Sequence, residues 1–230
     1  MRRTALFSVA VAVGIIFVCG GFIGGCSKTP SEERLARGVG VGTGGAAADV
    51  KSDGEFVHDV ALMNMAEIEL SRLAVERATS PGIKAFAQKL IDDHVAASAK
   101  LESVLSGHAI EWPAQLDDKH KERAGELAKQ QGPDFDREYT KAMIQSHQNL
   151  EARLESRLDV QSLADWKTAA AGRTQSQALP DPKGEMRDVP LRPNKSGNEL
   201  TMKINQWVAE TYPVAQKHLD TARTLENAAK

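Results

Sequence analysis

Four ionisable side chains, Glu67, His94, His147 and His218, occupy positions where the sequence pattern calls for apolar residues. Each lies on a stripe whose apolar members recur at steps of three and four, the spacing that places side chains on one face of a helix. In "FAQKLIDDHVAASAKL", for example, the stripe passes through His94. A buried carboxylate or imidazole without a partner costs several kcal/mol. We therefore expect the four groups to meet and to satisfy either each other or a bound ion.

The four stripes have the steps of a helix-bundle core, and each contains one group that can ligate a metal. Their members are Phe56, Val60, Met63, Glu67, Leu70 and Ala74; then Ile83, Ala87, Leu90, His94, Ala97 and Leu101; then Met143, His147, Leu150 and Leu154; and finally Leu200, Ile204, Trp207, Thr211, Val214, His218, Ala222 and Leu225. Three imidazoles and one carboxylate suffice to bind a borderline cation such as zinc, iron or copper. The sequence therefore predicts one transition-metal site.

The depth of these groups along the predicted helices supports their convergence. Glu67 lies before Ser80 and His94 lies after it, and the two separations along the sequence are nearly equal. At about 1.5 Å per residue, both groups lie about 20 Å from the same turn. His147 lies before Ala171, the predicted end of its helix, and His218 lies after Ser196, the predicted start of the next. These two separations are also nearly equal. The second pair also matches in depth if the connection between 172 and 195 closes one end of the bundle.

Three further polar residues are candidates for an outer layer of the site. Asp93, next to His94, could orient a histidine ring or serve as an extra ligand. Asp136 and Tyr139, in "FDREY", lie on the same stripe as His147. Helix capping by Asp136 and a hydrogen-bonded core role for Tyr139 are the alternatives for these two.

Two other interpretations remain open for the four central groups. They could form a metal-free hydrogen-bonded network in the core of a structural or interaction protein of the cell envelope. A hydrolytic enzyme with a metal-bound water would need an open coordination position and a cleft, and the sequence shows neither. Catalytic triads, phosphate loops and CxxC pairs are absent from the sequence. Histidines 58, 108 and 120 fall near helix starts or in a charged connection, where we expect them to be solvated.

The elements that position these residues are all predicted to be helices. Long helices are expected over 53–79, 81–107, 134–171 and 196–228, with a short surface helix inside 108–131 and a proline-rich loop over 172–196. Ser52 with Glu55, and Ser196 with Glu199, match the capping box, and Pro81 follows the cap residue Ser80. No segment alternates apolar and polar residues as a strand does. The prediction is an all-α, antiparallel four-helix bundle with a short extra helix between its second and third helices.

The first 25 residues differ from the rest, because Arg2 and Arg3 precede a long uncharged apolar run. This layout is typical of an export signal. The run ends in "IGGC", residues 23–26, which resembles a bacterial lipobox with Cys26 as the lipidated residue, and Ser27 favours sorting to the outer membrane. An uncleaved anchor is the alternative, since about 20 apolar residues can span a bilayer. We expect a periplasmic lipoprotein attached to the outer membrane by Cys26, with a glycine-rich tether over 26–52.

Composition limits the partners of the domain. The 230 residues contain 41% hydrophobic residues and carry a formal net charge of −2. Such a balance suits one globular domain and gives no basic footprint for nucleic acid. A protein partner is not indicated by the sequence. Cys19 lies in the apolar run and Cys26 is the other cysteine, so a disulfide within the mature domain is excluded.

Four segments together resemble one protein family, the domain of unknown function 4142. They are "MAEIELSRLAVERA", "FAQKLIDDH", "FDREYTKAMIQSH" and "YPVAQKHLDTA", and the resemblance extends over about residues 53–228. The family is placed among ferritin-like helical bundles, and its members are typically exported, often as lipoproteins. The resemblance thus implies a ferritin-like fold and an exported protein.

The family pattern falls on residues that the helical spacing also indicates: Glu67, Asp93, His94, Asp136, Tyr139, His147, Pro213 and His218. The chain departs from the family in about 25 additional residues before its last helix. Ferritin-like di-iron proteins carry Glu-x-x-His motifs, but Ile91, Ile144 and Ala215 stand three residues before the three histidines. We therefore expect a single metal ion and not a di-iron centre.

Overall fold

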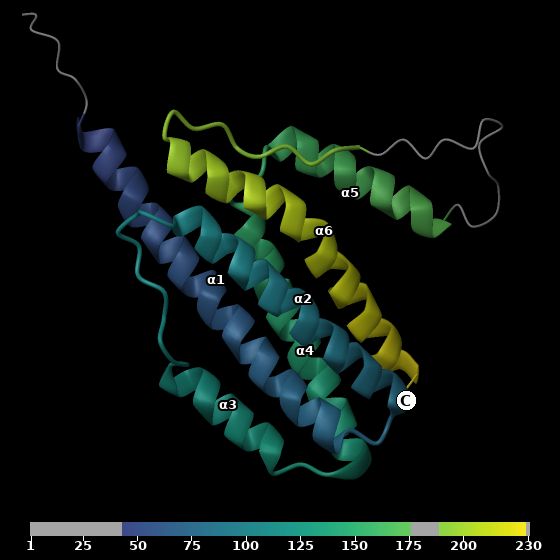
Figure 1. Cartoon of the computed structure of the whole chain (residues 1–230). Coiled ribbons are helices and arrows are strands. Elements are labelled where there is room, and N and C mark those ends of the chain that lie inside the picture. The colour runs from purple at the N-terminus through teal and green to yellow at the C-terminus, as the bar shows by residue number, and fades with distance from the viewer. Residues whose placement is uncertain (1–42, 176–188, 229–230) are drawn as a thin grey trace, which may run out of the picture. The chain divides into compact units, whose positions relative to one another are not determined.

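The computed structural model describes residues 43–175 and 189–228, with side chains described for 52–172 and 189–228. Six α-helices follow one another in these ranges (Figure 1). They are α1 (Thr43–Arg77), α2 (Pro81–Leu105), α3 (Asp118–Ala128), α4 (Gly132–Glu155), α5 (Val160–Gln175) and α6 (Glu199–Ala228). The described residues contain no strand, only an isolated β-bridge between Leu158 and Pro193. The predicted all-α fold is confirmed.

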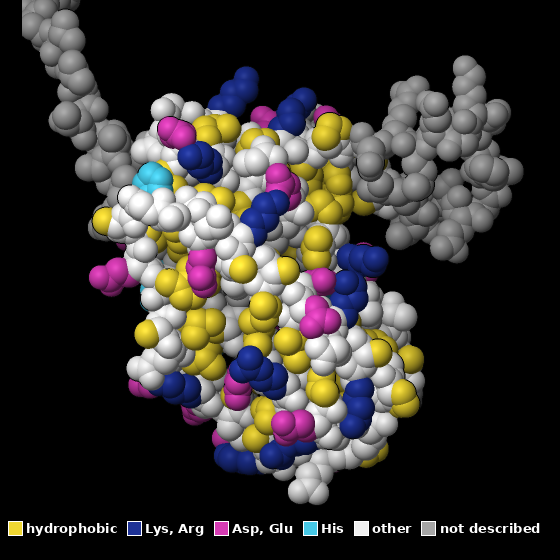
Figure 2. Space-filling view, in the orientation of Figure 1, with side chains coloured by type: hydrophobic (Ala, Val, Ile, Leu, Met, Phe, Trp, Pro, Cys, Tyr) yellow, Lys and Arg dark blue, Asp and Glu magenta, His cyan; other side chains and the backbone are white. Residues whose placement is uncertain are grey.

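The long helices α1, α2, α4 and α6 pack side by side around a common core. Helix α1 contacts α2 and α4, and α6 contacts the same two helices from the other side. The predicted short helix is α3, which packs across α1 and α4. Helix α5 runs along the outside of α6 (Figure 1), where the Trp166 ring lies 5.5 Å from that of Tyr212. On the face seen in Figure 2, positive and negative side chains are interspersed.

Local sequence signals explain several helix ends. Ser80 accepts a hydrogen bond from the Ile83 amide, and Pro81 opens α2, as predicted. Helix α2 ends before Gly107, whose φ of 82° is one that L side chains rarely adopt. Asp117 caps α3 by accepting a hydrogen bond from the amide of His120.

The core is divided into two hydrophobic clusters along the bundle. One cluster contains Phe56, Val60, Leu101, Leu150, Leu154, Ile204, Trp207 and Tyr212 among its buried members. The other contains Leu70, Ile83, Leu90, Phe135, Tyr139, Met143 and Ala222. On every long helix, the polar residue of the predicted stripe falls between the two sets in the sequence. The four groups therefore form a polar layer inside an otherwise apolar core.

The predicted helix over 134–171 is wrong in its extent, because α4 ends at Glu155 and a new helix, α5, begins at Val160. Asp159 accepts a hydrogen bond from the Ser162 amide at 2.8 Å and so begins a new helix. The backbone at Asp159 also donates to the carbonyl of Arg192. The local cap and this pairing outweigh the continuation of one long helix. Helix α5 then continues to Gln175, past the predicted loop start at 172.

Two helix starts differ from the prediction. Helix α1 begins at Thr43 and passes through Ser52, so the expected tether over 26–52 is helical from 43 onward. An established helix extends at low cost into residues of good propensity such as the three alanines of "AAADVK". At α6, Asn198 accepts from the Thr201 amide, whereas Ser196 accepts from the Asn198 amide. Asn198, and not Ser196, is therefore the cap.

Pro213 lies inside α6, which continues past it to Ala228. Figure 1 shows α6 changing direction along its length, as expected where a proline removes a backbone hydrogen bond. The predicted stripe loses its register near this point. Val214 is 41% exposed, whereas Tyr212 and Ala215 are buried.

The predicted export signal and Cys26 lie outside the described residues, as do residues 176–188, which fall within the predicted loop over 172–196. None of the described helices is both long enough and apolar enough to cross a membrane.

Candidate metal centre

Four helices each contribute one side chain to the polar layer: Glu67 from α1, His94 from α2, His147 from α4 and His218 from α6. All four are buried, with 0% to 5% of their surface exposed. The three imidazole rings pack against one another, with centroids separated by 5.3 to 5.6 Å. Residues far apart in the sequence therefore meet in one layer.

The ring of His94 is oriented by an amide on the neighbouring helix α1. Its Nδ1 lies 3.0 Å from Oδ1 of Asn64, and the amide nitrogen of Asn64 donates to Ser98. Because an amide oxygen only accepts, Nδ1 of His94 carries the hydrogen. In the neutral ring, Nε2 then presents a lone pair.

The other two histidines follow the same rule, His147 through Nδ1 and His218 through Nε2. Nδ1 of His147 donates to the carbonyl of Met143 at 3.0 Å, which leaves its Nε2 without a hydrogen in the neutral ring. Nε2 of His218 donates to Oδ2 of Asp93 at 2.7 Å, which leaves its Nδ1 free. Metal-ligating histidines are typically held in this way, with the second ring nitrogen bonded to a carboxylate or carbonyl.

The three free nitrogens are all buried and have no hydrogen-bond partner: Nε2 of His94, Nε2 of His147 and Nδ1 of His218. One ligand atom from each of the three rings can be chosen so that all lie within 4.8 Å of one another. Buried polar atoms are nearly always paired in folded proteins. Three convergent lone pairs of this kind form a preorganised set of ligands for a cation.

Glu67 lies beside this set and contacts two of the rings. Its Oε2 lies 2.7 Å from Nε2 of His94, yet the pair lacks the alignment of a hydrogen bond. Its Oε1 accepts from the hydroxyl of Ser146 at 2.5 Å and lies 3.5 Å from Nδ1 of His147. With a neutral His94, lone pairs of the carboxylate and the ring face each other at this short separation, which is favourable only with a proton or a cation between them.

Electrostatics keep the carboxylate charged and two of the rings neutral near pH 7. Burial alone would raise the pKa of Glu67, but the neighbouring His147 and His94 and the hydrogen bond from Ser146 lower it to about 2. Burial lowers the pKa of His147 despite the charge of Glu67. Burial likewise lowers the pKa of His218 to about 4, against the opposing effect of the hydrogen bond that the ring donates to Asp93. Neutral imidazoles and an ionised carboxylate are the forms that ligate metals.

The three predicted outer residues have different roles. Asp93 does orient a ring, but the ring is that of His218 on α6 rather than that of its sequence neighbour His94. Asp136 accepts hydrogen bonds from both amides of the turn at Thr79 and Ser80, so it ties α4 to the α1–α2 connection. It does not cap α4, whose N-cap is Gln131, and its hydrogen bonds go to this turn and not to the histidines.

Tyr139 also has a structural role. Its hydroxyl lies 2.9 Å from Oγ of Ser71, and its ring stacks on Phe135 with centroids 6.3 Å apart. Burial raises the pKa of Tyr139, and the charge of Glu67 acts in the same direction. The phenol therefore stays protonated and belongs to the core.

Two residues of the centre, Asn64 and Ser146, are absent from the sequence prediction. Asn64 lies three residues before Glu67 on the same helix, and Ser146 directly precedes His147. A polar residue three positions from a predicted ligand shares its helix face. That rule could have found Asn64, but nothing in the local pattern turns Ser146 toward α1.

The predicted depth match of His147 and His218 rests on helix ends that the structure does not have. The observed register can be read from Tyr212, whose hydroxyl donates to Glu155 at 2.7 Å and so places these two residues side by side. His147 precedes Glu155 by about two helical turns, and His218 follows Tyr212 by slightly less than that. At about 1.5 Å per residue these offsets differ by about 3 Å.

The chain was compared with known proteins through family models, curated sequences and solved structures. A model described as "Domain of unknown function (DUF4142)" matches residues 41–177, which is more than half of the chain. The match includes Glu67, His94 and His147 but ends before α6 and His218, whereas the resemblance of the sequence motifs extends to about 228. No curated protein and no solved structure matches the chain.

Proposed function

The chain belongs to the family of domains of unknown function DUF4142, and from this premise we propose that it binds a single transition-metal ion in its core. His94, His147 and His218 are the ligands, and Glu67 supplies the negative charge beside them. Two observations carry the proposal: the three rings bring candidate ligand atoms within 4.8 Å of one another, and each ring has one buried nitrogen without a hydrogen bond. Zinc, iron and copper suit such a site, because imidazole is a ligand for all three.

The ligand set is already oriented, which favours metal binding over a metal-free network. In a metal-free core, each unpartnered buried nitrogen costs about 1–3 kcal/mol. A chain selected only for packing could remove this cost with apolar residues of similar size. Here each ring instead has its outward nitrogen bonded, by Asn64, Met143 or Asp93, and its inward nitrogen free. Such a pattern is expected when the inward atoms bind an ion.

Elemental analysis of the purified protein tests the proposal directly. After equilibration with zinc and removal of unbound ions, we expect about one equivalent of metal per chain. His147→Gln is expected to lose the metal, and His108→Gln, at an exposed histidine, serves as the matched control. Less than a tenth of an equivalent of zinc, iron and copper in the wild-type protein would refute the proposal.

We also propose that the protein is exported and attached to the outer membrane through a lipid on Cys26. The support is the sequence pattern of two arginines, an apolar run and "IGGC". Labelled palmitate is expected to enter the wild-type protein and the Cys19→Ser variant, but not Cys26→Ser. Equal labelling of the two serine variants would contradict the lipid anchor.

A further inference from the structure

A cavity lies beside the metal centre, between α1, α3 and α4. Its volume is about 330 Å³, and its walls include Ala66 and Leu70 of α1, Arg123 of α3, and Gln145, Ser146 and Asn149 of α4. Helix α3 covers this space while burying only one of its own residues, Leu127. The cavity is therefore bounded on one side by the bundle and on the other by a thinly packed surface helix.

Ser146 connects this cavity to the histidines. Its side chain lines the cavity, and its hydroxyl donates to Oε1 of Glu67. The other oxygen of Glu67 lies 2.7 Å from the inward nitrogen of His94. One hydroxyl and one carboxylate thus separate the cavity from the proposed metal position.

Glu67 does not occupy the place of a fourth ligand equivalent to the histidines. Oε1 of Glu67 approaches His147 at Nδ1, the nitrogen that is bonded to Met143 and turned away from the centre. The group of candidate ligand atoms lying within 4.8 Å of one another contains the three histidines but not Glu67. The carboxylate thus flanks the three histidine nitrogens on the side of Ser146.

Resting on the proposed metal site, we infer that the metal has three protein ligands and takes a small external ligand at its fourth position, which faces Glu67. Water, or a small anion in its place, reaches this position from the cavity under α3. Glu67 accepts a hydrogen bond from the bound water and repels anions. Centres of three protein ligands with a fourth, exchangeable position are the arrangement that binds exogenous molecules.

The test uses the purified full chain loaded with Co(II), whose visible spectrum reports coordination, and azide as the probe. We expect a saturable spectral change of the wild-type Co(II) protein with azide. Glu67→Gln should retain Co(II) within about tenfold of the wild-type affinity and bind azide at least tenfold more tightly, because the negative charge beside the fourth position is removed.

The route is tested by filling the cavity. Asn149→Trp is expected to slow azide binding at least tenfold, whereas Gln148→Trp, at the adjacent exposed position outside the cavity lining, leaves the rate unchanged. Equal rates in the two variants would overturn the route. Should Co(II) bind with no response to azide, or should Glu67→Gln lose Co(II) more than a hundredfold, Glu67 is the fourth ligand and the inference fails while the metal site stands. If Co(II) does not bind, both fail.

Discussion

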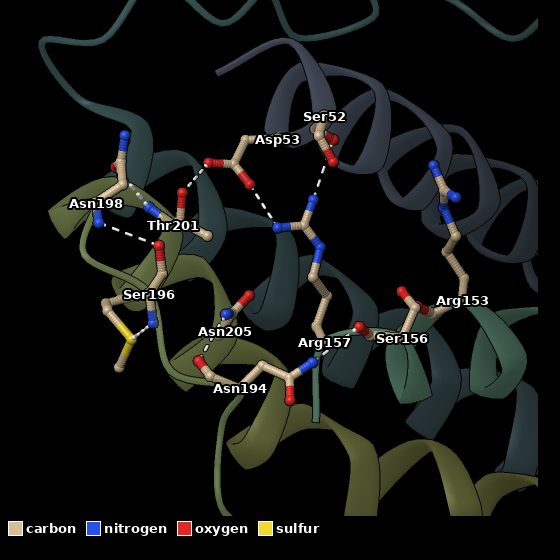
Figure 3. A network of polar contacts seen from close by, with 11 residues as sticks. Ser52, Asp53, Arg153, Ser156, Arg157, Asn194, Ser196, Asn198, Thr201 and Asn205 are labelled. Carbon is tan, nitrogen blue, oxygen red and sulfur yellow. Dashed lines mark hydrogen bonds and ion pairs between the residues drawn. The ribbon is translucent and has the colours of Figure 1, made fainter. Parts of the chain in front are cut away.

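Two buried polar clusters, one at the middle of the bundle and one at its end, use charged residues in opposite ways. At the end, Asp53 is completely buried and bonds to Arg157 at 2.5 Å and to Thr201 at 2.7 Å (Figure 3). Arg157 also donates to the Ser52 carbonyl and lies 4.5 Å from the centroid of Phe56. Neither oxygen of Asp53 is left without a partner.

In the middle cluster, the inward atoms have no hydrogen-bond partner. Oε2 of Glu67, Nε2 of His94, Nε2 of His147 and Nδ1 of His218 all lack hydrogen bonds. A satisfied network stabilises one arrangement of the helices, and at the end of the bundle it joins α1, the α4–α5 connection and the start of α6. A network whose convergent polar atoms lack hydrogen bonds lowers the stability of the fold, and a bound ion removes this penalty. The contrast favours a structural role for the end cluster and a binding role for the middle cluster.

The largest expected effect concerns metal-dependent stability. Zinc at about a thousand times its dissociation constant should stabilise the wild-type protein by about 4 kcal/mol. His147→Ala should abolish this gain, because one of three ligands is lost. Thermal unfolding with and without zinc measures the difference. An equal rise in the melting temperature of both proteins would remove the distinction between the two clusters.

Substitutions in the end cluster should lower stability without changing zinc binding. Asp53→Ala leaves the partly buried Arg157 and the hydroxyl of Thr201 without their acceptor, which we expect to destabilise the protein by about 3 kcal/mol. Zinc affinity should stay within a factor of two. Asp59→Ala, at the exposed partner of Arg153, is the control and should cost less than about 1 kcal/mol. Denaturant titration and zinc competition assays would show a failure of either expectation.

A smaller effect is expected at the carboxylate that orients His218. Asp93→Asn keeps the shape of the side chain but weakens its hold on the N–H of His218, so zinc affinity should fall about 10–100-fold. The neighbouring Asp92→Asn, at an exposed residue bonded to Gln88, should bind zinc as the wild type does. Competition with a chromogenic chelator measures both. Equal affinities would show that Asp93 does not support the centre.

The smallest effect lies between the two clusters, at Glu151 of α4. Burial, and then the charge of Glu155, raises the pKa of Glu151 to about 7. The folded state therefore binds this proton more tightly than the unfolded state, and stability should decrease as pH rises from about 4.5 to 7.

The variant Glu151→Gln should remove that pH dependence. Because the side chain is only half-buried, we expect a gain of about 1 kcal/mol at pH 8 after allowance for solvent screening. Denaturant unfolding of the two proteins at pH 5 and pH 8 measures it. If the stability difference between the two proteins is the same at pH 5 and pH 8, Glu151 is not the source of the pH dependence.

Much of the fold followed from local patterns. The spacing of apolar residues predicted the four long helices, and Ser80 with Pro81 marked the start of α2. The break after Glu155 was missed because Asp159 can be exposed on a continuing helix or can cap a new one, and pairing with the distant segment at Arg192 decides between them. The cap of α6 was misplaced because Ser196 and Asn198 are both good caps.

The candidate site, like the fold, was predicted from the sequence only in part. Helical periodicity is a local property, so the sequence alone was enough to place Glu67, His94, His147 and His218 on inward faces. Ring orientation depends on groups from other helices, so only the tertiary structure decided which nitrogen of each ring faces inward. It also gave Asp93 to His218 instead of its neighbour His94, turned Ser146 toward Glu67, and assigned Asp136 and Tyr139 to the scaffold. Residue types and their spacing determined what could meet, and the packing of separate helices determined how.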